Sequence, residues 1–371
     1  MTNVLKQIAD NLGVVGYDDS SLLIGIADYY GVNTAISTSL MGDILDAVGG
    51  NASTSNNYIQ DIVIALGGPS TSNNWIEEWE AITSGPIYFT TTWTTTAPTE
   101  TITLPYAAAG TYSGTIDWGD SNTDVNSFAN NTHTYAVAGT YTVIINGDCI
   151  GWNFGNYGGS THITSVVNWG QLQLGANTGG YFKDCPNLNL SSVSDLLDLT
   201  GITNLLSMFQ GSGITTINNI NLWNTSSVTN MSLMFRGATV FNQALSFDTS
   251  NVVDMARMFQ AAPAFNQALS TFDTSNVVNM TRMFQAATAF NQNIGSWNVA
   301  NVTSFSDFMT GKTPATFSTA NLDAIYNGWS ASGVQAGVNI NFGTAKYTVA
   351  AVAGRAILTG VNGWTITDGG L

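Results

Sequence analysis

Polar turns beside aromatic residues carry the side chains best suited to chemistry in this 371-residue chain. Phe247 and Phe272 each precede Asp-Thr-Ser-Asn-Val, and two tryptophans precede related turns. Carboxylate, hydroxyl and carboxamide groups exchange hydrogen bonds with sugar hydroxyls, while aromatic faces pack against sugar rings. The pattern predicts a surface for a glycan or protein ligand, formed by Trp223, Asp248, Thr249, Asp273, Thr274, Trp297 and Asn298. A second interpretation buries the aromatic residues and uses the polar ones to satisfy turn backbones.

A weaker candidate site lies in the turn Asp117-Trp-Gly-Asp120. Calcium takes several carboxylate oxygens, so Asp117 and Asp120 are candidate ligands, although two residues are few for such a site. The competing interpretation is that both carboxylates stabilise the turn through hydrogen bonds. No other cofactor is expected.

Catalytic motifs are absent from the sequence, which has no His-Glu-x-x-His, Gly-x-Ser-x-Gly, P-loop or dinucleotide fingerprint. The two histidines, His133 and His162, provide little material for histidine-based catalysis or a multi-histidine metal site. We expect His133 to be a hydrogen-bonded residue rather than a base, because no nucleophile accompanies it. The chain is therefore predicted not to be an enzyme, with carboxylate-only glycosidase chemistry left open.

The elements that position these turns repeat every 24 to 26 residues. The repeat is marked by Met208-Phe209, Met234-Phe235, Met258-Phe259, Met283-Phe284 and the inverted Phe308-Met309. A fixed period of this length indicates stacked units, each burying its apolar edge against the next. Stacked repeats present a surface more often than a catalytic pocket, which favours binding.

The repeats resemble the BspA-like leucine-rich repeats of bacterial surface proteins, including the mycoplasma-lipoprotein type. The resemblance rests on Phe-Asn-Gln, Phe-Asp-Thr-Ser-Asn-Val and the Asn-Met-Thr-Arg-Met-Phe of residues 279–284. It implies a right-handed β-solenoid over residues 156–315, closed by an α/β cap over residues 316–371. Such proteins are mostly adhesive or of unknown ligand, and the cap resembles closing segments in bacteriophage structural proteins and environmental surface proteins.

Two further regions precede the solenoid. Residues 1–85 repeat every 18 residues, with helix-start residues before apolar runs and glycines after them, which predicts short helices in an anchoring domain. Residues 86–98 are predicted to be a Thr-rich linker or strand. Asp117-Trp-Gly-Asp120, His133-Thr-Tyr and Gly139-Thr-Tyr-Thr-Val resemble the PKD domain, which implies an immunoglobulin-type β-sandwich over residues 99–155. The predicted fold class is thus multidomain and mainly β.

Composition restricts the partners. The formal net charge is −16, and no Lys or Arg occurs between Lys6 and Lys183, so nucleic acid is not an expected partner. No apolar run is long enough for a membrane helix, and the N-terminus does not read as a signal peptide. Cys149 and Cys185 are expected to be separate thiols rather than a disulfide framework.

These features together predict a bacteriophage virion protein, such as a head fibre, tail fibre or decoration protein. Residues 1–85 would dock on a capsid or tail protein, and the solenoid would bind a host surface protein or glycan. The chain would be made in the host cytoplasm and reside on the virion surface, with homo-oligomers possible. The alternative is a bacterial cell-surface adhesin.

Overall fold

The computed structural model describes residues 88–157, 160–175 and 178–371, which fold mainly as β-structure with few helices. Residues 88–371 belong to one compact unit. No helix in the described ranges is both long and apolar enough to cross a membrane. The helical repeats predicted over residues 1–85 lie outside the described residues.

A five-stranded sheet in the order β5-β4-β7-β1-β9 begins this unit. Strand β1 (Phe89–Thr95) pairs antiparallel with β7 (Gly139–Asn146) and with β9 (Ile163–Asn168). Its threonines suit a strand because β-branched side chains pack well on a pleated surface. The Thr-rich segment is therefore an internal strand rather than a linker, and β9 carries the sheet past the domain boundary expected at residue 155.

The other strands complete the β region, in which Trp93, Trp118, Tyr135 and Trp152 are buried. Short 3-10 turns η1 (Phe128–Asn130) and η2 (Phe154–Asn156) connect strands. Strand β2 (Glu100–Thr103) pairs with β6 (Thr132–Tyr135), and β4 (Thr115–Asp117) pairs with β5 (Thr123–Val125). In a three-stranded sheet, β8 (Cys149–Trp152) lies between β3 (Tyr106–Tyr112) and β10 (Leu172–Gln173).

Cys149 and Cys185 are buried and free, as expected of separate thiols. Burial raises the pKa of the Cys185 thiol to about 12. Both side chains therefore act as small apolar groups of the core rather than as nucleophiles.

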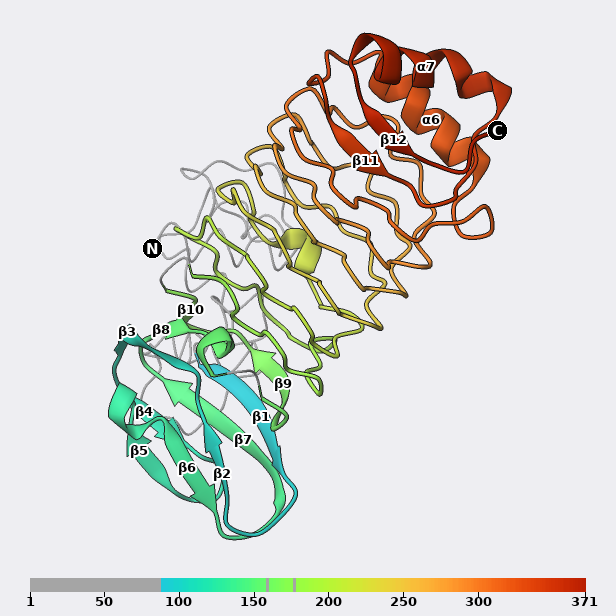
Figure 1. Cartoon of the computed structure of the whole chain (residues 1–371). Helices are drawn as coiled ribbons and strands as arrows, with labels where there is room; N and C mark the ends of the chain where they lie inside the picture. The colour runs from blue at the N-terminus through green and yellow to red at the C-terminus, as the bar shows by residue number, and fades with distance from the viewer. Residues whose placement is uncertain (1–87, 158–159, 176–177) are drawn as a thin grey trace, which may run out of the picture. The chain divides into compact units, whose positions relative to one another are not determined.

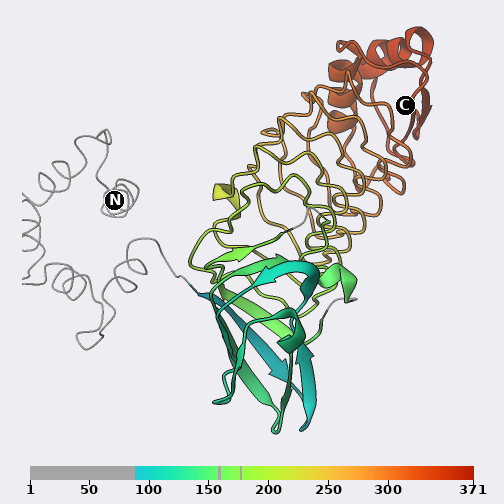
Figure 2. The same cartoon turned by 90° about the vertical axis from the view of Figure 1, so that its left-hand side faces the viewer.

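Residues 180–315, called the repeat stack below, form successive coils that lie one above the next (Figures 1 and 2). Parallel bridges join the same position of consecutive coils, running through Asn204, Asn230, Asp254, Asn279 and Ser304. Inside, rings of equivalent phenylalanines stack, as in Phe235 on Phe259 at 5.7 Å and Phe259 on Phe284 at 5.8 Å between centroids. One 3-10 turn, η3 (Ile220–Leu222), interrupts the regular coil. The predicted Met-Phe positions are thus core positions.

The backbone of each coil contains a residue in the left-handed conformation. Leu233, Arg257 and Arg282 have φ values of 59°, 57° and 56°, although none is glycine. The N–H of each donates to a carbonyl oxygen of the following coil, at 2.9, 2.8 and 2.9 Å. These inter-coil bonds offset a conformation that costs an L-residue about 1–2 kcal/mol.

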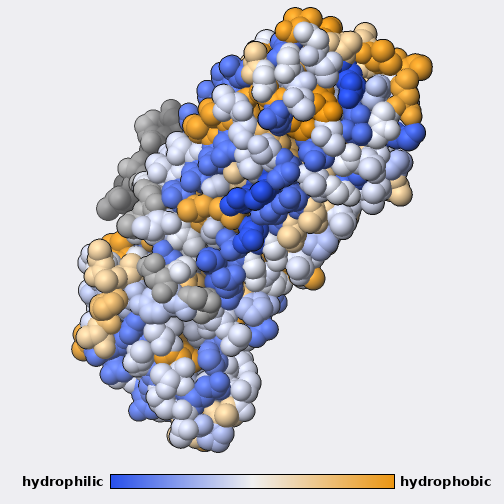
Figure 3. Space-filling model, in the orientation of Figure 1, coloured by the Kyte–Doolittle hydropathy of each residue, from blue (hydrophilic) through white to orange (hydrophobic). Residues whose placement is uncertain are grey.

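A cap closes the C-terminal end of the repeat stack (Figure 1). Helix α6 (Thr319–Ser330) begins at Ser318, whose side chain accepts the N–H of Asn321, and it buries Leu322, Ile325 and Trp329. Strands β11 (Asn339–Asn341) and β12 (Thr365–Thr367) pair in parallel, and η4 (Val349–Ala351), α7 (Val352–Ala356) and η5 (Ile357–Val361) lie between them in sequence. Figure 3 shows hydrophobic side chains gathered over this end, consistent with the exposed Val349, Val352, Ile357 and Val361.

Candidate binding site

The predicted ligand residues of the polar turns hold the coils together. Thr249 Oγ1 donates to the carbonyl oxygen of Asp273 in the next coil at 2.9 Å. Thr274 Oγ1 repeats this bond to Asn298 at 2.9 Å. In the opposite direction, Asn251 Nδ2 donates to the carbonyl oxygen of Ser226 at 2.8 Å. Thr249 and Thr274 are buried, so a surface ligand cannot reach their hydroxyls.

The carboxylates of these turns remain exposed but serve the local backbone. Asp248 Oδ1 accepts the N–H of Ser250 at 3.0 Å, and Asp273 Oδ1 accepts that of Ser275 at 2.9 Å. The serine hydroxyls, followed by these N–H groups, lower the pKa of Asp248 and Asp273. Asn298 Oδ1 makes the equivalent bond to Ala300 at 3.1 Å. The turn-backbone interpretation therefore accounts for these side chains.

The expected aromatic platform requires correction. Trp223 and Trp297 are only 5% and 2% exposed, and Phe247 and Phe272 are equally enclosed. Trp297 Nε1 donates to the carbonyl oxygen of Leu269 at 3.1 Å, inside the stack. These rings fill the space between coils, because an apolar residue at the same position of every coil packs on its neighbours. They offer no face to a sugar.

An ion pair joins two coils at Arg282. Arg282 Nη2 lies 3.0 Å from Asp307 Oδ2 in the next coil. Asp254 Oδ1 accepts the N–H of Ala256 at 2.8 Å, as a turn residue.

The carboxylates of the candidate calcium turn have partners within the protein. Asp117 Oδ1 accepts the N–H of Gly119 at 2.9 Å, and Asp120 Oδ1 accepts that of Asn122 at 3.1 Å. Asp120 Oδ2 lies 2.8 Å from His133 Nε2, whose ring stacks on Trp118. The turn hydrogen bonds and the hydrogen-bonded histidine are as expected. Over the described residues, no group of three or more His, Cys, Asp or Glu side chains is placed to hold a metal.

A hollow of about 390 Å³ lies where the β region meets the first coil of the repeat stack. Two threonines of β2, Tyr157 after η2 and residues 160–162 before β9 contribute to its walls. Its lining consists of Thr101, Thr103, Phe154, Tyr157, Ser160, Thr161, His162 and Asp184. Hydroxyl groups, a carboxylate, an imidazole and aromatic rings thus converge from segments far apart in sequence.

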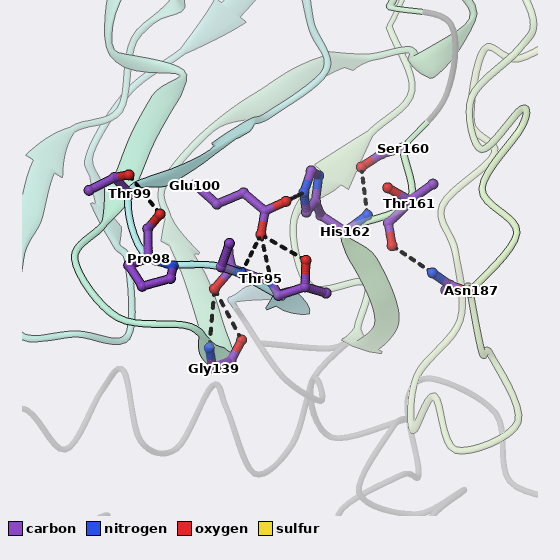
Figure 4. Close-up of polar contacts among 11 residues, drawn as sticks. Thr95, Pro98, Thr99, Glu100, Gly139, Ser160, Thr161, His162 and Asn187 are labelled. Carbon is purple, nitrogen blue, oxygen red and sulfur yellow. Dashed lines mark hydrogen bonds and ion pairs between the residues drawn. The ribbon is translucent and has the colours of Figure 1, made fainter.

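A hydrogen-bonded carboxylate and imidazole border this hollow (Figure 4). Glu100 Oε1 lies 2.9 Å from His162 Nε2, and Glu100 Oε2 accepts the backbone N–H groups of Thr96 at 2.6 Å and Ala97 at 3.2 Å. The hydrogen bond from His162, followed by those two N–H groups, lowers the pKa of Glu100 to about 2. Glu100 is therefore an anion that orients the imidazole of His162. It also stabilises the turn before β2 by accepting the N–H groups of Thr96 and Ala97.

The loop before β9 is fastened to the repeat stack at two points. The N–H of Ser160 donates to the carbonyl oxygen of Asp184 at 3.2 Å. Asn187 Nδ2 donates to the carbonyl oxygen of Thr161 at 2.7 Å (Figure 4). Ser160 Oγ accepts the backbone N–H of His162 at 3.2 Å, so the serine meets the main chain of the histidine rather than forming a nucleophile pair with its ring.

None of these hollow-lining residues was a predicted ligand residue. Thr101 and Asp184 are separated by most of the β region, and no repeat or motif connects them. One signal was present at Tyr157, since it stands in the glycine-rich segment Asn153-Phe-Gly-Asn-Tyr-Gly-Gly, which is typical of a surface loop. Exposed aromatic residues in such loops are candidates for binding.

Comparison with known proteins finds one similarity. A family model described as a Mycoplasma protein of unknown function, DUF285, matches residues 180–322. No curated protein and no solved structure matches the chain. The matched region coincides with the repeat stack and agrees with the mycoplasma-type resemblance of the repeats. The function of this family is unknown, so the match assigns no function to the chain. The BspA-like and PKD-like resemblances stay predictions.

Proposed function

We propose that this chain is a non-enzymatic structural protein of a bacteriophage virion that presents its repeat stack for attachment to a host surface. In this proposal it is a head fibre, tail fibre or decoration protein. The stack is interpreted as a right-handed, leucine-rich-repeat-like solenoid, and the β region as a PKD-like, immunoglobulin-type sandwich. Residues 1–85 dock on a capsid or tail protein, and the rest of the chain faces outward.

The observation that carries this proposal is the bonding between coils. Backbone bonds, threonine hydroxyls and asparagine amides each connect a coil to its neighbour at the same position. Such a stack holds its shape without a ligand, as a protein that projects a binding surface from a particle must. The β region and the cap cover its two ends, which limits uncontrolled growth by end-to-end pairing.

A bacterial cell-surface adhesin is the second candidate. The family model that matches residues 180–322 is described as a Mycoplasma protein, and Mycoplasma is a cellular organism, which favours this candidate. Either protein would bind a surface protein or glycan, so the two differ in location and not in the chemistry of binding.

Mass spectrometry of gradient-purified virus particles from the source culture separates these candidates. We expect the chain in the particles at a fixed ratio to the major capsid protein, and the copy number would distinguish a fibre from a lattice decoration. The matched control is the cell-envelope fraction of the same culture. Recovery from envelopes alone would reject the virion role and support the adhesin.

A further inference from the structure

The hollow beside Glu100 and His162 has the chemistry of a carbohydrate site. We propose that it binds a neutral saccharide, through hydrogen bonds to sugar hydroxyls and packing on one exposed aromatic ring. Its volume of about 390 Å³ falls within the ~300–1,000 Å³ of small-molecule sites. This proposal rests on the proposed binding role of the chain, although not on its location in a virion.

Tyr157 supplies the aromatic face. Tyr157 as a residue is 40% exposed, while its hydroxyl donates to the carbonyl oxygen of Tyr106 at 2.7 Å. The hydroxyl is therefore already used, and the ring is held in one orientation at the edge of the hollow. A fixed and exposed ring loses little conformational entropy when a sugar packs against it.

The polar groups around Tyr157 both donate and accept. Thr101, Thr103, Ser160 and Thr161 contribute hydroxyls or backbone groups, and Asp184 contributes a half-exposed carboxylate. Each sugar hydroxyl donates one hydrogen bond and accepts others, so a mixed lining of this kind matches it. A lining that contained only donors or only acceptors would leave part of each sugar hydroxyl without a hydrogen-bond partner.

Charge favours a neutral saccharide over a sulfated or phosphorylated one. Asp184 contributes a carboxylate to the lining of the hollow. Glu100 lies beside the lining residue His162 and carries a negative charge, because its pKa is lowered to about 2. Lys183 is the neighbouring cation, but its Nζ lies 3.7 Å from Asp184 Oδ2 and is directed to that carboxylate. An anionic sugar would meet repulsion there that a neutral one avoids.

The walls are organised before any ligand arrives. The bonds from Ser160 to Asp184 and from Asn187 to Thr161 join the loop to the first coil, and Glu100 orients His162. A preorganised site needs little rearrangement on binding, which improves affinity for a weakly interacting ligand such as a sugar.

The test uses the full chain on an array of neutral oligosaccharides of glucose, galactose, mannose and N-acetylhexosamines, followed by calorimetric titration of the strongest binder. Tyr157→Ala should weaken binding roughly tenfold or more, the loss expected for one aromatic contact. Tyr157→Phe keeps the ring but loses the bond that fixes its orientation, so it should bind more weakly than the unchanged protein and more tightly than Tyr157→Ala. Phe128→Ala is the matched control, because Phe128 is similarly exposed at 45% but does not line the hollow.

Asp184→Asn provides a second variant of nearly unchanged shape. It should weaken binding severalfold while the melting temperature stays constant, which separates lost recognition from lost folding. The proposal is overturned if no neutral saccharide binds, if sulfated or phosphorylated sugars bind instead, or if Tyr157→Ala binds as tightly as Phe128→Ala. Saccharide binding by a chain that is missing from virus particles would remove the virion role and leave this site in place.

Discussion

Thr249 Oγ1 donates to the carbonyl oxygen of Asp273 at 2.9 Å, and so joins two residues whose spacing had suggested a shared ligand. The spacing of 24 residues does bring them together, but across two coils and with the threonine buried. The same bond recurs from Thr225 to Asp248 and from Thr274 to Asn298. A conspicuous polar repeat thus contributes to the stability of the stack, and four predictions test this and related features.

Thr249→Val should lower the free energy of unfolding by about 0.5–1.5 kcal/mol, because the isosteric change removes the hydroxyl that donates to the Asp273 carbonyl oxygen. Thr239→Val is the control, since Thr239 is exposed in the same repeat and should change stability by less than about 0.5 kcal/mol. Urea unfolding of both variants measures the difference. Equal effects would show that the hydroxyl bond between coils contributes nothing.

The two repeat tryptophans should respond differently to replacement by phenylalanine. Trp297→Phe loses the bond to the Leu269 carbonyl oxygen, whereas Trp223 Nε1 has no hydrogen-bond partner among the described residues. Phe247 and Phe272 occupy the same position in the intervening coils, so the site accepts the smaller ring.

We therefore expect Trp297→Phe to be more destabilising than Trp223→Phe by about 1 kcal/mol. Thermal unfolding of the two single variants, compared under one set of conditions, checks this. A larger loss for Trp223→Phe would mean that ring volume, rather than the indole N–H, dominates at this position.

Glycine should stabilise the left-handed positions of the coils. Ala261 and Ala286 are exposed and have φ values of 53° and 59°. Ala261→Gly and Ala286→Gly should each gain about 0.5–1 kcal/mol in unfolding free energy, because backbone strain is relieved.

Ala289→Gly is the matched control, since Ala289 is exposed but does not have a positive φ. It should lose about 0.5–1 kcal/mol through the added freedom of the unfolded chain. Denaturant midpoints of the three variants give the comparison. Losses of equal size at all three positions would contradict strain at Ala261 and Ala286.

Acid should weaken the contact between the β region and the loop before β9. The folded-state pKa of Glu100 is about 2, below its ordinary value of 4.5, so its stabilising contribution is complete above pH 4.5 and is lost as the pH falls toward 2. Glu100→Gln should flatten the fall in urea midpoint across this range.

His162→Gln should make that fall smaller and end it at a higher pH, because the hydrogen bond from His162 is the largest cause of the lowered Glu100 pKa. Titration of the Glu100 side-chain carboxyl by NMR in both the unchanged protein and His162→Gln measures the shift directly. If the Glu100 pKa is unchanged in the variant, the backbone N–H groups of Thr96 and Ala97, rather than His162, cause the lowered pKa.

Features that repeat were predictable because identical residues meet at fixed spacing. The Met-Phe positions were expected to be core, and Phe235, Phe259 and Phe284 stack in the interior. A β-rich region before the repeats and an α/β cap after them were also expected, and the structure has strands such as β7 and helix α6 there. The extent of the sheet was not predictable from the sequence. Strand β9 pairs with β1 only because the chain comes back to the open edge of β1 after leaving the β region, and no sequence pattern marks that return.

The candidate site could not be predicted in the same way. Thr101, Tyr157, His162 and Asp184 have no common period, and their convergence depends on loops fastened by Ser160 and Asn187. Burial also decided which turn residues are accessible to a ligand. A sequence does not distinguish a tryptophan that faces solvent from one that is packed between coils.

The amino-acid sequence by itself determined the period, the apolar interior and the polar turns of the repeat stack, because each coil has the next coil as its neighbour. Only the tertiary structure decided that Thr249 and Trp297 face inward while Tyr157 faces outward. The physical reason is that repeated contacts depend on local spacing, whereas a hollow between unlike segments depends on the complete path of the chain.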